Sequence, residues 1–419
     1  MSKNVAVIIL AAGKGERMKS ELPKVLHCLC GRPLVSYVLS LVKDLKIKSK
    51  VAVVGYKHEK VRAHLGGDIK VAVQEKLLGT ADAVRKALAL LKGFHGTTLI
   101  LYGDIPLLKK ETIDKLIKRH RDVGASATFL TAKMEKPQGY GRVLRDKYST
   151  MCGIIEEKDA DDFQKDIKEI NTGIACFDKD KLVEALKSVK LNKKKKEYYL
   201  TDVIGILYSK NELVETVDLS DACEGMGINS QKELAKAARV MQQRINDELM
   251  DMGVNITDPQ TTFIDYGVKI GQGTVIYPFT VIEKNVKIGK NCFIGPFVHL
   301  REDTQVKNHV TLGNFLEVAR SRLDSGIFIK HFGYIGDARL GRSVNIGAGT
   351  VTANFDGKNK NTTVIEDGAF IGSDTVLVAP VRIGKSAVTG AGAVVLKDSK
   401  VPAGEVVVGV PARLLKKRK

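Results

Sequence analysis

The stretch KIGQGTVIYPFTVIEKNVKIGKNCFIGPFVHL (Lys269–Leu300) repeats one pattern along its whole length. An aliphatic residue returns at every sixth position, beginning with Ile270, Ile276 and Ile282, and glycine often follows it. A six-residue period is typical of hexapeptide solenoids, in which each unit is one short strand and a turn. Three units close one triangular coil with the aliphatic residue pointing into the prism. The stretch therefore predicts a left-handed parallel β-helix.

The same period covers most of the second half of the chain. It runs from Ile264 to Val318, resumes at Leu340 and Ile346, and returns from Ile365 to Val407. Before the last run, the segment ANFDGKNKNTTV (Ala353–Val364) is polar and interrupts the period. A loop that is ejected from a solenoid usually carries function, so we expect site residues in this segment.

The first half of the chain follows a different pattern, in which apolar runs alternate with amphipathic segments. Continuous apolar runs predict strands that are covered on both faces. We expect strands at Val5–Leu10, Lys50–Gly55, Thr98–Asp104 and Ser126–Ala132, and helices at Leu34–Leu45, Ala81–Leu91 and Thr112–His120. Such alternation indicates an α/β doubly wound, Rossmann-like domain with a largely parallel sheet.

A helix is predicted between the two halves. Ser230 and Glu233 have the spacing of a capping box, which marks a helix start. One face then carries the apolar residues Leu234, Ala238, Met241, Ile245 and Leu249. We therefore divide the chain into an α/β domain (residues 1–229), a helical linker (230–251) and a β-helix domain (252–419).

Composition narrows the class of protein. Hydrophobic residues make up 44% of the 419 residues, which is typical of a globular protein. No apolar run reaches the roughly 18 residues of a membrane span, and the N-terminus has no cleavage site of a secretory signal. The chain has six cysteines and no CxxC pair, which favours a reducing, cytoplasmic location.

The formal net charge of +19 raises the possibility of a nucleic-acid partner. The basic residues are scattered, however, apart from the run Lys193–Lys196 and the basic tail Lys416–Lys419. The sequence contains no zinc finger, helix-turn-helix or aromatic RNA-binding motif. We therefore expect no nucleic-acid partner, and interpret the lysines as solvated residues that also attract phosphorylated small molecules.

The loop LAAGKGERMKSELPKVL (Leu10–Leu26) follows the first predicted strand. A glycine-rich loop at this place lets backbone N–H groups approach phosphates closely. Arg17 and Lys24 add two cations that could face a triphosphate. The spacing is neither GxxxxGK[ST] nor GxGxxG. An ordinary turn with solvated cations remains the alternative.

This loop resembles the signature of sugar-1-phosphate nucleotidyltransferases. Further segments strengthen the resemblance: VQEKLLGTADAV (Val73–Val84), LYGDIPLL (Leu101–Leu108), QGYGRV (Gln138–Val143), IIEEKDA (Ile154–Ala160), EINTGI (Glu169–Ile174), EYYLTD (Glu197–Asp202) and EGMGINS (Glu224–Ser230). Together with the β-helix, essentially the whole chain is similar to the bacterial family of bifunctional N-acetylglucosamine-1-phosphate uridylyltransferases and glucosamine-1-phosphate acetyltransferases.

The resemblance implies a uridylyl-transfer site in the first half, with UTP and N-acetylglucosamine-1-phosphate as substrates. Asp104 and Asn229 would bind Mg²⁺, for which oxygen ligands are suited, and Arg17 and Lys24 would neutralise the triphosphate. EGMGINS has about two residues more than expected before Asn229. The implied UDP-N-acetylglucosamine contacts are Leu10, Ala11, Ala12, Gly13, Lys24, Gln74, Gly79, Thr80, Tyr102, Gly103, Asp104, Gly141, Glu156, Asn171 and Asn229.

The resemblance also implies an acetyl-transfer site in the β-helix, with His331 as general base, because neutral imidazole accepts protons near neutral pH. The implied contacts to the acceptor, glucosamine-1-phosphate, are Arg301, Tyr334, Asn345 and Lys360. The implied contacts to acetyl-CoA are Ala348, Asn354, Phe355, Ser373 and Ala391. In this family each acetyl site lies between subunits, so a homotrimer is expected.

Three positions depart from the family pattern. Ala319 stands where the family carries a phosphate-binding lysine, with Arg320 next to it; Phe355 replaces a tyrosine; and Gly409 stands where an arginine meets CoA. A monofunctional sugar-1-phosphate nucleotidyltransferase, whose β-helix is only a trimerisation or regulatory module, is therefore an alternative. A non-enzymatic regulator is a third, but a scaffold would not need Arg17, Lys24 and Asp104.

Overall fold

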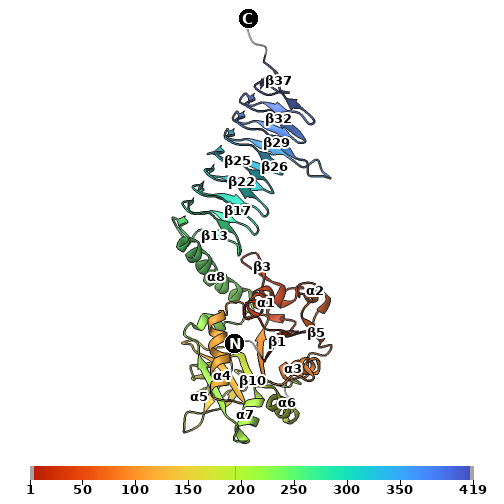
Figure 1. The fold of residues 1–419 in the computed structure, drawn as a ribbon, viewed down its shortest axis with the longest axis vertical. Coiled ribbons are helices and arrows are strands. Elements are labelled where there is room, and N and C mark those ends of the chain that lie inside the picture. The colour runs from red at the N-terminus through yellow and green to blue at the C-terminus, as the bar shows by residue number, and fades with distance from the viewer. Residues whose placement is uncertain (1–3, 194, 416–419) are drawn as a thin grey trace. The chain divides into compact units, whose positions relative to one another are not determined.

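The computed structural model describes residues 4–193 and 195–415, which form two compact units (Figure 1). The first unit ends at Ala238 and the second begins at Arg239. Lys194 and the basic tail Lys416–Lys419 lie outside the described residues. Among the described residues, no helix is both long and apolar enough to cross a membrane.

The first unit is built on one twisted sheet with the strand order β11-β7-β10-β6-β1-β4-β5. In addition, β8 pairs with β10, and β9 pairs with β8. The strands are β1 (Val5–Ala11), β4 (Ser49–Val54), β5 (Lys70–Val73), β6 (Thr97–Tyr102), β7 (Ala127–Lys133), β8 (Arg142–Arg145), β9 (Met151–Ile155), β10 (Glu169–Asp178) and β11 (Val214–Asp218). Along this order, β10 runs antiparallel to β6 and β7, and the other neighbours are parallel.

Helices cover both faces of this sheet. They are α1 (Leu34–Asp44), α2 (His58–Arg62), α3 (Thr80–Leu88), α4 (Lys110–Asp122), α5 (Asp162–Lys165), α6 (Lys179–Ser188) and α7 (Asp202–Ser209), and a small hairpin, β2 (Cys28–Leu29) and β3 (Arg32–Pro33), precedes α1. Side chains of α1 and α4 share one core cluster with the sheet, and those of α3, α6 and α7 share another. The doubly wound α/β architecture is confirmed.

The second unit is a parallel β-helix, as the six-residue period predicts. Its first face contains β12 (Asn255–Ile256), β15 (Val275–Ile276), β18 (Phe293–Ile294), β21 (Thr311–Leu312), β24 (Phe328–Ile329), β27 (Asn345–Ile346), β30 (Phe370–Ile371), β33 (Val388–Thr389) and β36 (Val406–Val408), with β37 (Arg413–Leu414) antiparallel to β36. Its second face contains β13 (Phe263–Ile264), β16 (Val281–Ile282), β19 (Val298–Leu300), β22 (Leu316–Ala319), β25 (Gly333–Gly336), β28 (Val351–Ala353), β31 (Val376–Val378) and β34 (Val394–Val395). Its third face contains β14 (Lys269–Ile270), β17 (Lys287–Ile288), β20 (Gln305–Val306), β23 (Arg322–Leu323), β26 (Ala338–Leu340), β29 (Thr363–Ile365), β32 (Val381–Ile383) and β35 (Lys400–Val401).

The predicted inward positions between Ile264 and Val407 are all buried, with at most 8% of each residue exposed. The sequence period is lost between Val318 and Leu340, yet the coils continue through Leu323, Ile329 and Ile335, which are also buried. The steps from Val318 to Leu323 and from Ile335 to Leu340 are five residues long instead of six. Two corners of the prism are therefore one residue shorter than the others.

The shortened corners hold a pair of oppositely charged residues. Arg320 and Asp337 each take a left-handed backbone conformation, with φ of 49° in both. Arg320 donates from Nε and one terminal nitrogen to the two oxygens of Asp337, both at 2.8 Å. This two-pronged contact raises the pKa of Arg320 and lowers that of Asp337.

Helix α8 (Gln231–Asp251) begins in the first unit and ends in the second. The backbone N–H of Glu233 donates to Ser230 Oγ at 3.3 Å, as in a capping box, whereas the Glu233 carboxylate accepts from the N–H of Asn229 at 2.7 Å. Within the second unit, the Gln242 amide exchanges two hydrogen bonds with the backbone of Ile264 in the first coils of the β-helix. This half of α8 therefore satisfies backbone groups that a solenoid end would otherwise leave without partners.

Candidate active sites

The opening loop brings Lys24 back to the end of the first strand. After β1 the chain forms two short 3₁₀ turns, Glu16–Met18 and Lys24–Leu26, with Gly15 between β1 and the first of them. Gly15 has a φ of 71°, and a Cβ at this position would lie 2.6 Å from Lys24 Cβ. Glycine is therefore required on two grounds, backbone conformation and the close approach of Lys24.

Lys24 joins the two implied metal ligands. Its ammonium group donates to the Asp104 carboxylate and, at 2.9 Å, to Asn229 Oδ1. Asp104 follows β6 and is only 6% exposed, and its carbonyl accepts from the N–H of Ile228 at 3.0 Å. The backbone bond and the Glu233 contact to Asn229 together hold Asp104 and Asn229 beside each other, although 125 residues separate them in the sequence.

The other implied residues of the opening loop differ in exposure, and Arg17 does not form a hydrogen bond or ion pair with Lys24, Asp104 or Asn229. Arg17 is exposed, and its side chain has no hydrogen-bond or ion-pair partner among the described residues. Leu10, Ala11 and Ala12 are buried, whereas Gly13 is exposed. Gly103 follows β6, and its N–H donates to the carbonyl of Leu10 at 2.9 Å.

The segment with Gln74, Gly79 and Thr80 forms the entry to α3. Gln74 is 3% exposed, and its amide nitrogen donates to the Gly79 carbonyl at 3.0 Å and to Asp82 at 2.8 Å. Thr80 Oγ1 accepts from the N–H of Leu200 at 3.0 Å. Tyr102 lies beside Thr80, and burial raises the pKa of its hydroxyl. These contacts fix the amide and backbone groups that would read a base.

The implied sugar-binding residues lie on β8–β10 and the adjoining loops. The N–H of Asn171 donates to the Gly141 carbonyl at 2.9 Å. Thr201 donates to Glu156 at 3.2 Å, and burial raises the pKa of the Glu156 carboxyl. Tyr140 was not assigned from the sequence; burial raises the pKa of its hydroxyl, and the charges of Glu233 and Asp104 also raise it.

In the β-helix, four residues share one corner of the prism. His331, Ala348, Ser373 and Ala391 each come two residues after a strand of the first face, in four successive coils. Backbone hydrogen bonds connect these corners. The N–H of Gly349 donates to the carbonyl of Phe332 at 2.8 Å, and the N–H of Asp374 donates to the carbonyl of Ala348 at 2.6 Å. We call this line of residues the His331 corner. The sequence period alone does not reveal that the implied base and the implied CoA contacts lie in one line.

The other implied residues of the acetyl site lie on the first and second faces and at the corner between the second and third faces. Tyr334 lies on β25 of the second face and Asn345 on β27 of the first. Arg301 follows β19 and donates to Glu317 at 3.2 Å. Asn354 is 7% exposed and donates to Asp337 and, at 3.5 Å, to the Tyr334 hydroxyl. Lys360 and Phe355 form an isolated bridge across the base of the ejected loop, and both are exposed.

The three departures from the family pattern have different structural settings. Ala319 is fully buried at a shortened corner, and the neighbouring Arg320 is committed to Asp337. Arg320 therefore holds Asp337, which in turn holds Asn354 at the start of the ejected loop. Gly409 has a φ of 91°, a conformation that an arginine would adopt only with strain.

Two family models match the chain. The MobA-like NTP transferase domain matches residues 7–169, and the bacterial transferase hexapeptide model (six repeats) matches residues 267–301, 285–320 and 362–397. The chain is 44% identical to the bifunctional protein GlmU of Carboxydothermus hydrogenoformans, over 93% of this chain and 95% of that protein. It is 43% identical to the GlmU of Pelotomaculum thermopropionicum, over 90% of each, and 41% identical to a GlmU of Listeria monocytogenes, over 95% of this chain and 94% of that protein.

The chain belongs to the GlmU family. It is a bifunctional transferase of UDP-N-acetylglucosamine synthesis, with uridylyltransferase and glucosamine-1-phosphate acetyltransferase activities, and so contributes to cell-wall synthesis. The similarity extends over both units, which argues against the monofunctional alternative. The hexapeptide matches agree with a left-handed β-helix.

Gly15 gives a first prediction for the uridylyl reaction. Gly15→Ala should lower UTP-dependent pyrophosphate release about tenfold or more, because the new methyl group pushes Lys24 from its partners. Gly93→Ala is the matched control: its φ of 75° carries the same backbone cost, roughly 1 kcal/mol, but no atom lies within 4 Å of the added Cβ. Initial rates at equal folded protein check this. Equal rates for the two variants would contradict the proposed role of the contact.

Proposed function

We propose that the cluster formed by Lys24, Asp104 and Asn229 is the uridylyl-transfer site. The observation that carries this assignment is that the Lys24 ammonium donates to both other side chains. A phosphate oxygen of N-acetylglucosamine-1-phosphate attacks the α-phosphorus of UTP, and pyrophosphate leaves. Both reactants are anions, so Lys24 and Arg17 lower the barrier by neutralising the triphosphate. Gln74, Gly79 and Thr80 hold the uracil, and Gly141, Glu156 and Asn171 hold the sugar.

Asp104 and Asn229 fit a magnesium ion. Their side chains offer oxygen atoms, which Mg²⁺ prefers, and a cationic group, the Lys24 ammonium, already lies between them. Asp104 and Asn229 would hold the ion through these oxygens and leave it accessible to substrate phosphates and water. When bound, the ion would supply positive charge to the phosphate groups. Lys24, the neighbouring cation, would then contact the substrate phosphates.

We propose that acetyl transfer takes place at the His331 corner. His331 accepts a proton from the amine of glucosamine-1-phosphate while the amine nitrogen forms a bond to the thioester carbon. The C–S bond of the thioester then breaks, and the thiolate takes the proton from His331 and leaves as the thiol of CoA. Ala348, Ser373 and Ala391 continue the same corner and would lie along acetyl-CoA, together with Asn354 and Phe355 on the ejected loop. Arg301, Tyr334, Asn345 and Lys360 would hold the acceptor.

One assay tests both assignments in the unmodified chain. With Mg²⁺, UTP and N-acetylglucosamine-1-phosphate it should release pyrophosphate, and with glucosamine-1-phosphate and acetyl-CoA it should release a free thiol. Because Ala319 and Gly409 each lack a cation that the family places at an anionic ligand, we expect a raised requirement for acceptor and acetyl-CoA. Absence of thiol release even at millimolar acetyl-CoA would refute the acetyl site.

We propose a cytoplasmic homotrimer assembled through the β-helix. The six cysteines are all free thiols, as expected in a reducing compartment. Outward residues on two faces of the prism are largely apolar: Val275, Phe293, Phe328, Phe370, Val388 and Val406 on the first, and Phe263, Val281, Val351, Val376 and Val394 on the second. Apolar stripes of this length that are exposed or only half-buried are typical of interfaces. Pairing of two different faces closes a ring of copies.

A charge placed on one of these faces should break the assembly. Val388→Asp, on the first face, should lower the mass measured by light scattering from about three chains to one, because a carboxylate would be buried without a partner. Val364→Asp, at a similarly half-buried outward position on the third face, should leave the mass unchanged. A monomeric unmodified chain at micromolar concentration, or equal effects of both variants, would contradict the proposed interface.

A further inference from the structure

The third face of the β-helix presents a column of cations. Register pairs connect Lys269 to Lys287, Lys287 to Gln305, Gln305 to Arg322 and Arg322 to Arg339 across adjacent strands. The column continues through Val364 to Arg382 and Lys400. All six basic residues of the column are exposed. Adjacent strands are about 4.8 Å apart, so neighbouring cations lie on one line at close spacing.

Such a column is not explained by packing. The other two faces carry mostly apolar residues at equivalent positions, such as Phe370 and Val376, whereas like charges on directly opposite strand positions destabilise a sheet. Arg382 is compensated, because it donates to Glu366. Arg322 and Arg339 have no hydrogen-bond or ion-pair partner among the described residues, although they are immediate neighbours in the column.

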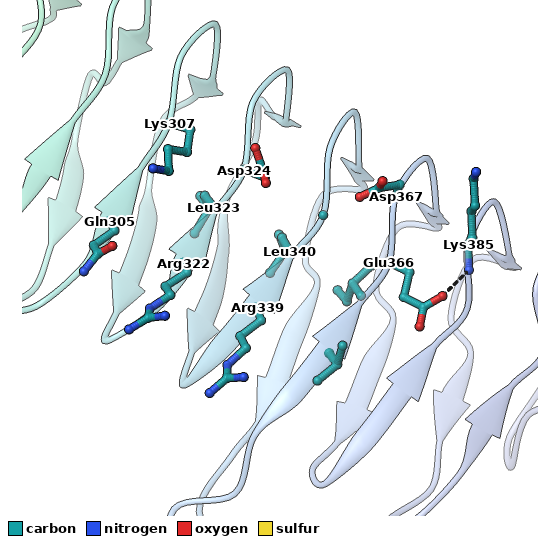
Figure 2. Close-up of a pocket in the computed structure, with 13 residues that line it drawn as sticks. Gln305, Lys307, Arg322, Leu323, Asp324, Arg339, Leu340, Glu366, Asp367 and Lys385 are labelled. Carbon is teal, nitrogen blue, oxygen red and sulfur yellow. Dashed lines mark hydrogen bonds between the residues drawn. The ribbon is translucent and has the colours of Figure 1, made fainter.

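A groove of about 550 Å³ opens at these two arginines (Figure 2). Gln305, Arg322 and Arg339 extend from successive strands on one side of it, and the turns that follow these strands form the other side, where Lys307 lies. Lys385 adds a fourth basic residue at the far end. The groove is separate from the His331 corner, which lies between the first and second faces.

The carboxylates that line the groove are already engaged. Glu366 accepts from Arg382 and from the N–H of Lys385, the latter at 3.0 Å. Asp367 accepts from the N–H of Arg342 at 2.8 Å, and Asp324 accepts from the N–H of Ser325 at 2.6 Å. None of these acids contacts Arg322 or Arg339, so the two guanidinium groups remain available to an anion.

We propose that this groove binds a small, multiply charged phosphate ligand, with Arg322 and Arg339 contacting its phosphate groups. Guanidinium groups match phosphate oxygens in geometry as well as charge. A compact ligand fits better than a long polyanion, because acidic residues such as Asp265, Glu283, Asp303 and Asp337 recur along the corner that precedes the third face. The site is independent of the two active sites and of the function proposed for them.

The test uses the full chain without divalent metal, titrated calorimetrically with inorganic pyrophosphate and, separately, with inorganic phosphate. We expect a binding step for pyrophosphate that the double variant Arg322→Gln/Arg339→Gln weakens at least about tenfold, as lost bonds to a charged group should. The matched control is Lys269→Gln/Lys287→Gln, which removes two charges from neighbouring positions of the same column outside the groove. It should weaken this step less than about twofold.

Thiol release and pyrophosphate release should be unchanged in both double variants, which also shows that they are folded. If Arg322→Gln/Arg339→Gln is misfolded, the single variants Arg322→Gln and Arg339→Gln replace it. Each should weaken pyrophosphate binding about threefold or more. An unchanged binding step overturns the proposal. An equal loss of pyrophosphate affinity in Lys269→Gln/Lys287→Gln also overturns it, because the affinity would then come from the positive charge of the whole face. Tighter binding of a single-stranded oligonucleotide, weakened equally by both double variants, would assign the face to a long polyanion instead.

Discussion

Replacing Asp104 with asparagine should lower pyrophosphate release from UTP at least about 100-fold. The substitution keeps the size of the buried side chain but removes the negative charge that faces Lys24. A metal ion at a phosphoryl group contributes several kcal/mol of transition-state stabilisation, and about 2.7 kcal/mol corresponds to a factor of 100 in rate. Initial rates with saturating substrates and Mg²⁺ measure the effect, and removing the metal with EDTA should reduce the rate of the unmodified chain in the same way.

Two comparisons make this result specific. Asp68→Asn removes a carboxylate that pairs with Lys50 but is itself largely exposed, and it should change the rate less than about twofold. Thiol release from acetyl-CoA should stay at the unmodified level in both variants, because Asp104 and Asp68 both lie in the first unit. Near-normal uridylyl turnover in Asp104→Asn would refute the assigned metal site.

Replacing His331 with alanine should lower acetylation of glucosamine-1-phosphate by about 10²- to 10⁴-fold, the usual contribution of a general base. The side chain is exposed at the His331 corner, so the fold should tolerate its loss. Pyrophosphate release from UTP and N-acetylglucosamine-1-phosphate should not change. The rate of thiol release, followed at several acetyl-CoA concentrations, separates a loss of turnover from a loss of binding.

His309 provides the control for this variant. It is also an exposed histidine of the β-helix. Because its φ is 58°, asparagine is used as the substitution, since its side chain tolerates a left-handed backbone conformation better than most. His309→Asn should leave thiol release within about twofold of the unmodified chain. If His331→Ala behaves like His309→Asn, another group is the base.

The regular parts of both units could be predicted because their information is local. A strand that is covered on both faces needs a continuous apolar run, and a coil of the prism needs an aliphatic residue at every sixth position; both patterns are visible in the sequence. The period failed between Val318 and Leu340 because two corners are one residue shorter, and their left-handed residues, Arg320 and Asp337, pair across adjacent coils. The local sequence around each corner does not indicate that these two residues pair.

The candidate sites depend on pairings that are distant in sequence. Asp104 was expected at a strand end, but its contact with Lys24, and that of Lys24 with Asn229, follow from how β6, the opening loop and the start of α8 come together. Likewise, the alignment of His331 with Ala348 and Ser373 requires the number of residues in each coil, including the ejected loop. The motifs identified the residue types, whereas the fold supplies their distances.

If one chain carries two independent transfer sites, variants that each lack one site should complement each other when they are mixed. The measured quantity is UDP-N-acetylglucosamine formed from glucosamine-1-phosphate, acetyl-CoA, UTP and Mg²⁺. Asp104→Asn and His331→Ala should each form almost none alone, whereas an equimolar mixture should regain a substantial part of the unmodified rate, because the acetylated intermediate passes between them through solution. A mixture as inactive as its components, with both variants folded, would contradict the presence of two independent sites.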